Sequence, residues 1–566
     1  MNEHIRQTHH HSGLPVAGWL TALEQPEDLA AFRAAYGSDA GLIRERATLA
    51  RRALQAFRER FGDLPVRLFR APGRTNLRGM HVDTHGGFLN LMTHQREVVL
   101  VAARSEGDVS ALANVNPAFN EVAFRTEEES GYTGEPESWF DFISQPAVRK
   151  RVNARGSLPA RAWANYLIGA ALRVSREVPG SPPPGLKMMV DSDLPSGAAL
   201  SSSAALSVAS LMAFKAYTGA ALSMEQLIRA EQDVEWYAGA RVGMSDQTAI
   251  LMGKQGRMLH LSVFAEDFSL EGARYIPFPD ALKLLVIHSH TTRNLSGAQR
   301  ARYSLNRFAY SMALTVLRKE LLQSGWENGQ VRSLDRLSRL TPEALGGVER
   351  VYKLLVRIPE TIDLDSLRQR YAPPGLEEAY ARYFDGVPEE QQPRQIPLRG
   401  PLLFGIAESE RARCFPGLFE QGAHQEAGSL MTIGHDGDRV MGRDGHPYAM
   451  DVSDPALAAL AAVRLPLARC PGKYGASSPA LDALVDAACA SGALGASLTG
   501  AGIAGAVLAL CRDEDTEAVK SGILQCLRSE AYTRLAEWST PPAASDIDRA
   551  VVINHGVAGA GEIVPE

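Results

Sequence analysis

Pro195-Ser196-Gly197-Ala198-Ala199-Leu200-Ser201-Ser202-Ser203-Ala204 follows a predicted strand at residues 186–190 and runs into residues 204–217, an apolar stretch with the length of a buried helix. A strand, a loop and a helix in this order often bind phosphate, because the free N–H groups and the positive dipole end of the helix face the ligand. Small residues let the backbone approach a polyphosphate, and the serine hydroxyls can bond phosphate oxygens or Mg²⁺. A serine-rich turn that caps a buried helix is the alternative, since the stretch has no lysine and is not a G-x-x-x-x-G-K-[ST] loop.

Two further glycine-containing segments lie on either side of this loop in the chain. The first, Ala71-Pro72-Gly73-Arg74-Thr75-Asn76, follows the alternating residues 66–70, and an antiparallel arrangement is expected there. The second, Thr499-Gly500-Ala501-Gly502-Ile503-Ala504-Gly505, lies between predicted strands at 495–498 and 506–511. A dinucleotide site would need a helix after the glycines and an acid ~20 residues further on, so that function is disfavoured. Taken alone this segment is a tight turn, but the three segments together predict a phosphotransferase that uses a nucleotide.

Three candidate acidic residues lie between the serine-rich loop and residues 499–505. Asp246 is placed on a loop after a predicted helix at 225–237. An Asp beside a sugar hydroxyl can take its proton or stabilise it during phosphoryl transfer, although a turn cap is the simpler role. Glu231 and Glu235 are one turn apart on one face of that helix, where one of them could bind Mg²⁺ or both could face solvent.

In this order the segments resemble those of the GHMP kinase superfamily, and of galactokinase within it. The superfamily loop Pro-x-x-x-Gly-Leu-x-Ser-Ser-Ala resembles residues 195–204, with Ala199 at the glycine position. The galactokinase signature Gly-Arg-x-Asn-Leu-Ile-Gly-Glu-His-x-Asp-Tyr-x-Gly-Gly resembles Gly73-Arg74-Thr75-Asn76-Leu77-Arg78-Gly79-Met80-His81-Val82-Asp83-Thr84-His85-Gly86-Gly87. Gly-Ile-Met-Asp-Gln becomes Gly243-Met244-Ser245-Asp246-Gln247, and the C-terminal Gly-Ala-Gly-Phe-Gly-Gly becomes residues 500–505, with Ala504 replacing a glycine.

The resemblance implies an α+β protein of two lobes, with a ribosomal protein S5 domain 2-like N-terminal lobe and an α/β-plait C-terminal lobe. ATP and sugar would meet in the cleft between the lobes. With this fold we expect a helical N-terminal extension at 1–60, an N-terminal lobe at 61–285 and a C-terminal lobe at 286–566. Charged, proline-containing residues at about 328–399 and the Asp-, Gly- and Pro-rich residues 434–472 are interpreted as insertions.

The resemblance also implies a role for individual residues. Asp246 would act on the anomeric hydroxyl, and Arg74 would stabilise the developing charge. The candidates for ATP are Pro195, Gly197, Ala198, Ala199, Leu200, Ser201, Ser202, Ser203, Ala204, Gly500, Ala501 and Gly502. The candidates for Mg²⁺ are Ser202, Ser203, Glu235 and Glu231, with Glu235 preferred. The candidates for the sugar are Met80, His81, Asp83, Gly243 and Arg300.

Met80 is the departure that bears on the sugar. The family has a glutamate there, which in galactokinase contacts the C6 hydroxyl, and a thioether accepts no hydrogen bond of consequence. A site built to bond a hydroxyl discriminates against its absence, so the substrate is expected to differ from galactose. Arg78 in place of an apolar residue, with Arg300 near the family's sugar-site tyrosine, would suit a uronic acid. An apolar Met80 would instead suit a 6-deoxy sugar or a pentose, with Arg78 in solvent.

Three functions are compatible with this resemblance. The first is an active sugar-1-kinase. The second is a catalytically silent sensor of sugar and ATP, since Ala199 and Ala504 would impair phosphate binding if the backbone there needs positive φ. The third, a kinase of a non-sugar alcohol such as a mevalonate or homoserine relative, is disfavoured by the retained His81-Val82-Asp83 and Gly86-Gly87.

Composition limits the partners and the location of the protein. The 566 residues carry a formal charge of −6, which attracts neither nucleic acid nor an anionic membrane. The first residues lack the apolar core of a secretory signal, and His9-His10-His11 are interpreted as a solvated tail. The five cysteines show no CxxC pairing, so a cytoplasmic location is expected. The expected partners are small molecules, a monosaccharide and ATP, as the resemblance implies.

Overall fold

The computed structural model describes residues 13–130, 138–178, 183–195, 197, 199–292, 297–385 and 387–565, and the side chains of residues 297–300 and 303 lie outside that description. A nine-stranded sheet forms the centre of the first half of the chain, with its main strand order β1-β2-β3-β6-β4-β5. Its two longest strands, β2 (Pro65–Arg78) and β3 (Phe88–Arg104), are antiparallel, as expected from the sequence. The other strands are β1 (Leu14–Pro15), β4 (Val109–Asn114), β5 (Val122–Arg125), β6 (Leu186–Ser192), β7 (Arg257–Ser262), β8 (Arg274–Pro277) and β15 (Gly561–Ile563).

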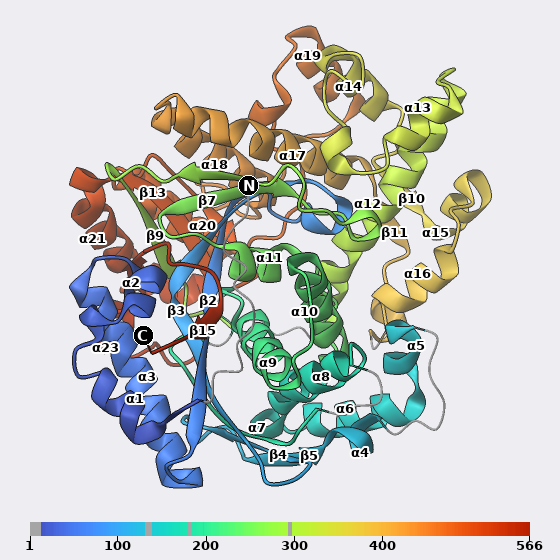
Figure 1. The fold of residues 1–566 in the computed structure, drawn as a ribbon. Helices are drawn as coiled ribbons and strands as arrows, with labels where there is room; N and C mark the ends of the chain where they lie inside the picture. Colours follow the sequence, from blue (N-terminus) through green and yellow to red (C-terminus); the bar gives the residue numbers. More distant parts are fainter. Residues whose placement is uncertain are drawn as a thin grey trace.

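Both faces of this sheet are buried, and the alternation along β3 explains how. Val99, Val101 and Ala103 pack with the N-terminal helices, whereas Val98 and Leu100 point to the opposite face and join the main core. Figure 1 shows the two layers: α1, α2 and α3 on one side of the blue strands and the green helices on the other. These helices are α1 (Val16–Ala22), α2 (Ala30–Tyr36) and α3 (Ala40–Phe61), and then α8 (Ala164–Ser175), α9 (Ser202–Thr218), α10 (Met224–Ala238) and α11 (Ser245–Met252).

A second, four-stranded antiparallel sheet lies in the C-terminal half, with strand order β12-β13-β9-β14. It is built from β9 (Leu282–His288), β12 (Gly495–Thr499), β13 (Ala506–Arg512) and β14 (Val551–Ile553). Helices α20 (Pro479–Ala490) and α21 (Thr516–Leu527) pack with it in an apolar cluster of their own. Two mixed helix and sheet lobes of this kind confirm the predicted fold class.

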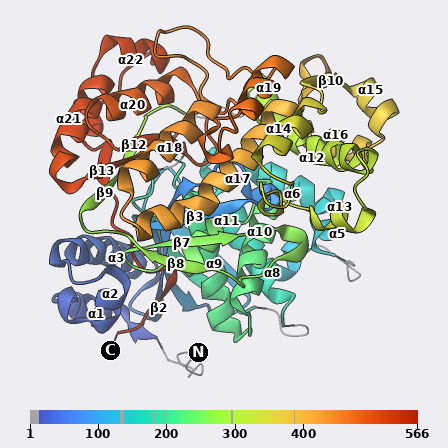
Figure 2. The same cartoon turned by 90° about the horizontal axis from the view of Figure 1, so that it is seen from above.

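Helices α12 (Gly297–Gln323), α17 (Arg399–Glu420) and α18 (His424–Asp438) connect the lobes, and Figure 2 shows α17 and α18 over the edge of the first lobe. Between α12 and α17 lie the short elements α13 (Asn328–Ser333), α14 (Val348–Val356), β10 (Thr361–Asp363), α16 (Leu376–Tyr383) and β11 (Gln395–Pro397). The predicted start of the second insertion, at about 434, falls in the last turn of α18, and α19 (Asp454–Ala462) follows it. The domain boundaries otherwise stay a prediction. Nowhere in the described ranges is a helix both long and apolar enough to cross a bilayer.

The segment after β14 returns from the second lobe to the first. Ala558 N–H donates to Ala35 O, and Gly559 and Ala560 N–H donate to the loop and helix around α11. β15 then pairs with β2, so residues from the far end of the chain complete the first sheet.

Candidate active site

A cavity of about 310 Å³ lies between the two lobes and collects residues from separate stretches of the chain. Its walls are formed by Arg74, Asn76, Met80, His81, Asp83, Thr84, Tyr166, Gly197, Ala199, Ser201, Ser202, Ser203, Glu235, Ala240, Val242, Gly243, Ser245, Asp246, Arg307, Tyr474, Gly500, Ala501 and Ala504. The cavity therefore brings the three glycine-containing segments and Asp246 to one place.

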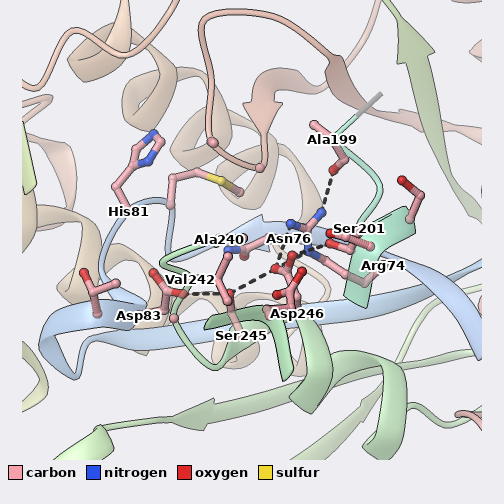
Figure 3. A pocket seen from close by; sticks show the side chains of 18 of the residues that line it. Arg74, Asn76, His81, Asp83, Ala199, Ser201, Ala240, Val242, Ser245 and Asp246 are labelled. Atoms are coloured by element: carbon pink, nitrogen blue, oxygen red, sulfur yellow. Dashed lines mark hydrogen bonds and ion pairs between the residues drawn. The ribbon is translucent and has the colours of Figure 1, made fainter. Parts of the chain in front are cut away.

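Arg74 and Asp246 are in direct contact in this cavity (Figure 3). Arg74 Nε and Nη2 lie 2.8 and 2.7 Å from Asp246 Oδ1, and Ser201 Oγ donates to Asp246 Oδ2. Arg74 Nη1 donates to the carbonyl of Ala199, so the same guanidinium contacts both the carboxylate and the serine-rich loop. Asp246 lies in the first turn of α11 and not on a loop as predicted, because the helix already begins at Ser245.

Asp83 is tied to Asp246 through one hydroxyl. Ser245 Oγ donates to Asp83 Oδ2 at 2.8 Å and lies 3.3 Å from Asp246 Oδ1. Gly243 packs against the same carboxylate, since a Cβ added there would lie 2.1 Å from Asp83 Oδ2. The two acids thus form one hydrogen-bonded row along the cavity floor (Figure 3).

We expect Gly243→Ala to displace Asp83 and break its bond to Ser245. If Asp83 holds the acceptor substrate, KM for that substrate should rise about tenfold or more, because misplacement by ~1 Å can cost about 10² in rate. Steady-state kinetics with the acceptor varied would measure this. Gly329→Ala is the matched control, since nothing lies within 4 Å of a Cβ at that position, and equal kinetics of the two variants would contradict the role of Asp83.

The serine-rich loop and the third glycine segment touch each other. Ala199 has φ +58°, in the left-handed region that L-residues with a Cβ adopt at a cost, and Ser201 has φ +63°. A Cβ on Gly500 (φ +78°) would lie 2.8 Å from Ala199 Cβ, so only glycine lets the two loops approach this closely. Ala504, the other alanine at a family glycine position, is not in the left-handed region, whereas its neighbour Ile503 is (φ +67°).

The predicted nucleotide residues separate into cavity and core positions. Gly197, Ala199, Ser201, Ser202, Ser203, Gly500 and Ala501 line the cavity. Leu200 and Ala204 pack into the main core, and Gly502 lies against the carbonyl of Ala476. Pro195 precedes the loop outside the cavity wall, and Ala198 lies outside the described residues. The wall therefore combines small residues from two loops with the serine hydroxyls of one, a composition that suits a polyphosphate.

Glu231 and Glu235 are buried side by side on α10. Among the described residues the Glu231 carboxylate has no hydrogen-bond partner, the Glu235 carboxylate lies beside the Ser203 hydroxyl, and of the two acids Glu235 lines the cavity. Burial, together with the charge of Asp246, raises the pKa of Glu235 to about 8, while burial and the charges of Glu235 and Asp246 raise the pKa of Glu231 well above its usual value. Two buried carboxylates side by side fit a divalent cation, which would compensate their charge.

Hydroxyls and phosphate oxygens would have to complete such a cation site. In the described ranges no group of three or more His, Cys, Asp and Glu side chains is arranged to hold a metal. Mg²⁺ is often bound by one or two carboxylates plus substrate phosphates, and Ser202 and Ser203 lie on the same wall as Glu235.

The predicted sugar residues Met80, His81, Asp83 and Gly243 all line the cavity. His81 stacks on Tyr474 with 4.6 Å between ring centroids. Met80 is 2% exposed and packs with the apolar cluster of the second lobe while it contributes to the wall. Arg78 neither lines the cavity nor reaches solvent: it is buried, with Nη1 3.4 Å from Glu408 Oε2. The two orientations considered for Arg78 from sequence were thus both wrong, because an acid 330 residues away pairs with it. Arg300, the remaining sugar candidate, belongs to α12, but its side chain lies outside the described residues.

Several wall residues were not predicted. Arg307, seven residues after Arg300 and so about two helical turns on, lines the cavity and donates from Nη1 to Arg241 O at 2.6 Å. Asn76 and Ser245 stood inside the recognised motifs and could have been chosen, whereas Tyr166 carried no signal in the sequence.

Three family profiles match the chain in the order of its lobes. The galactokinase galactose-binding signature matches residues 55–104, the GHMP kinases N terminal domain matches 165–254 and the GHMP kinases C terminal domain matches 449–527. The chain therefore carries the N- and C-terminal domains of GHMP kinases together with the galactose-binding signature of galactokinases. Since its sequence relatives are galactokinases too, it is galactokinase-like among the GHMP kinases.

Sequence relatives and a solved structure agree with this. The chain is 32% identical over 268 residues to the galactokinase of Chloroflexus aurantiacus, covering 47% of this chain and 59% of that one. It is 30% identical to the Homo sapiens galactokinase (49% and 63% covered) and 26% identical to that of Streptomyces coelicolor (83% and 90% covered). The chain thus spans about three fifths of the length of the first two relatives. The crystal structure of Lactococcus lactis galactokinase complexed with galactose shares the fold, with a TM-score of 0.58, 18% identity and 90% and 98% coverage.

Proposed function

We propose that this protein is an ATP-dependent kinase that phosphorylates the anomeric hydroxyl of a monosaccharide. The observation that carries the proposal is the contact between Arg74 and Asp246, at the point where the galactose-binding signature meets the serine-rich loop. In this arrangement Asp246 accepts the proton of the hydroxyl as it attacks the terminal phosphoryl group. Arg74, placed between the carboxylate and the loop, stabilises the charge that develops on the transferred group.

Loop backbones and hydroxyls would bind the triphosphate. The N-terminus of α9 begins at Ser202, so its free N–H groups and the hydroxyls of Ser202 and Ser203 face the cavity. Glu235, with Glu231 behind it, would hold Mg²⁺, which supplies charge neutralisation of the phosphates. Asp83 and His81 would bind sugar hydroxyls on the opposite wall.

We propose a uronic acid or another C6-modified sugar as the acceptor. Met80 offers no acceptor for a C6 hydroxyl, and Arg307 places a guanidinium on the cavity wall, which favours an anionic substituent. Arg78 no longer supports this substrate, because it is paired with Glu408. Rates of ADP release on galactose, galacturonate, arabinose and fucose decide the question, and efficient turnover of galactose would remove the argument from Met80.

A silent sensor is the second candidate, and the left-handed backbone at Ala199 is the observation that favours it. Sugar-dependent release of ADP by the purified protein separates the two functions. Binding of sugar and nucleotide without any ADP release would establish the sensor instead.

Ala199→Gly tests whether the strained alanine limits activity. We expect the variant to be more stable by up to about 1 kcal/mol, because glycine adopts φ +58° without the Cβ penalty but loses more chain entropy on folding. For an active kinase, kcat should change by less than about threefold, since the loop already has the conformation that glycine would adopt. Thermal melting and steady-state rates measure both quantities, and activity that appears only in the glycine variant would favour the sensor.

A further inference from the structure

A buried group of charges on α17 lies directly behind the sugar end of the cavity. Glu408 and Arg411 are both 0% exposed, and Arg411 Nε donates to Glu408 Oε2 at 2.7 Å. Arg78 reaches the same carboxylate oxygen from the first lobe. Burial acts to raise the pKa of Glu408, but the charges of Arg78 and Arg411 outweigh it and hold that pKa below its usual value, so the carboxylate is ionised.

The free oxygen of Glu408 holds the backbone that carries the sugar residues. Oε1 accepts from Gly79 N–H at 2.7 Å and from Met80 N–H at 3.1 Å. These two residues immediately precede His81 in the cavity wall. Gly79 has φ +102°, and a Cβ there would lie 2.4 Å from Phe88 O, so this is a tight turn whose N–H groups converge on one acceptor.

Arg411, on the same helix as Glu408, holds the cavity wall that faces the His81 turn. Its Nη1 and Nη2 donate to the carbonyls of Cys470 and Pro471, three to four residues before Tyr474. Tyr474 stacks on His81, so the two segments that Glu408 and Arg411 fix meet at the cavity. Space for Arg78 is provided by Gly434, where a Cβ would lie 1.7 Å from Arg78 Nη1.

We infer that Glu408 and Arg411 are positioning residues for the acceptor substrate: one buried ion pair on α17 sets the relative placement of the turn that carries His81 and the segment that carries Tyr474. Neither side chain lines the cavity, so both act through the backbone they hold. The hydrogen bonds and ion pairs of Glu408 and Arg411 within the described residues go to the acceptor end and not to the nucleotide loops, so we expect the effect to be confined to that end. The inference rests on the proposed function, because the substrate of that function is what the wall would position.

Glu408→Gln tests the inference. An amide accepts fewer charge-assisted bonds, and its NH₂ would face the Arg411 guanidinium, so the turn at Gly79 and Met80 should loosen. KM for the acceptor, measured with whichever of galactose, galacturonate, arabinose or fucose the wild-type protein turns over, should rise about tenfold to a hundredfold, while KM for ATP stays within about twofold. An unchanged acceptor KM in the folded variant, or an equal rise in both KM values, would overturn the inference.

Glu410→Gln is the matched control on the same helix. Glu410 pairs with the partly exposed Arg413 and contacts no cavity segment, so its kinetics should equal those of the wild type. Hydrogen exchange of the wild-type protein gives a second test. It can be carried out even if Glu408→Gln does not fold or if no sugar is turned over. The amides of Gly79 and Met80 should be strongly protected without ligand, and rapid exchange there would contradict the positioning role whatever the protein's activity.

Discussion

Asp246→Asn is expected to lower kcat by about two to four orders of magnitude, because the amide keeps the shape of the side chain but cannot take a proton from the acceptor hydroxyl. It also loses the ion pair with Arg74, which would then face the nucleotide in a different orientation. Sugar-dependent ADP release at saturating substrates measures the effect.

Two controls make this result specific to the chemical step. Binding of a non-hydrolysable ATP analogue, followed by calorimetry, should change little, since the serine-rich loop and the third glycine segment are intact. Asp267→Asn removes a carboxylate that is 67% exposed and pairs with Arg336 outside the cavity, so it should leave turnover unchanged. More than about a tenth of wild-type kcat in Asp246→Asn would show that this carboxylate is not the base.

Glu235→Gln should have opposite effects on activity and on stability. At saturating ATP, the variant should lose most Mg²⁺-dependent turnover, by about a hundredfold, because the carboxylate that faces the cavity is gone. The metal-free variant should nevertheless be more stable than the metal-free wild type at pH 8. The wild-type penalty arises because the carboxylate is buried beside the charge of Asp246, and glutamine removes it.

The pH dependence of this stability follows from the raised pKa. Below pH 4.5 Glu235 is protonated in both the folded and unfolded states and contributes no difference. Above that pH the unfolded chain loses the proton, while the folded chain keeps it until about pH 8. The metal-free protein therefore loses stability across this range, by roughly a few kcal/mol. Thermal melts of wild type and Glu235→Gln from pH 5 to 8.5, with and without Mg²⁺, measure it. A wild-type melting temperature that rises with pH relative to the variant, without Mg²⁺, would contradict this account.

Local sequence patterns were sufficient for much of the fold. The strand at 186–190 and the helices at 204–217 and 225–237 were predicted to within about two residues, because each has a clear period or an apolar run bounded by turn residues. The hairpin of β12 and β13 around the third glycine segment was predicted for the same reason. The parallel pairing of β4 with β6 was not, since it depends on contacts between residues about 75 positions apart.

The candidate site shows the same division. Arg74, Asp246 and the glycine loops stand in recognisable motifs, and their meeting in one cavity could be expected from the resemblance. The environment of Arg78 could not be predicted, because no sequence pattern near Arg78 indicates its pairing with Glu408 or the space at Gly434. Likewise, α11 begins at Ser245, so Asp246 lies in its first turn and not on the loop expected there.

The return of residues 558–563 to the first lobe has a consequence for synthesis on the ribosome. The edge beside β2 and the contacts around α11 stay open until almost the entire polypeptide has been made. The lobe translated first is therefore the one finished last, and a nascent chain halted before residue 558 would expose an unpaired strand edge to chaperones and to neighbouring chains.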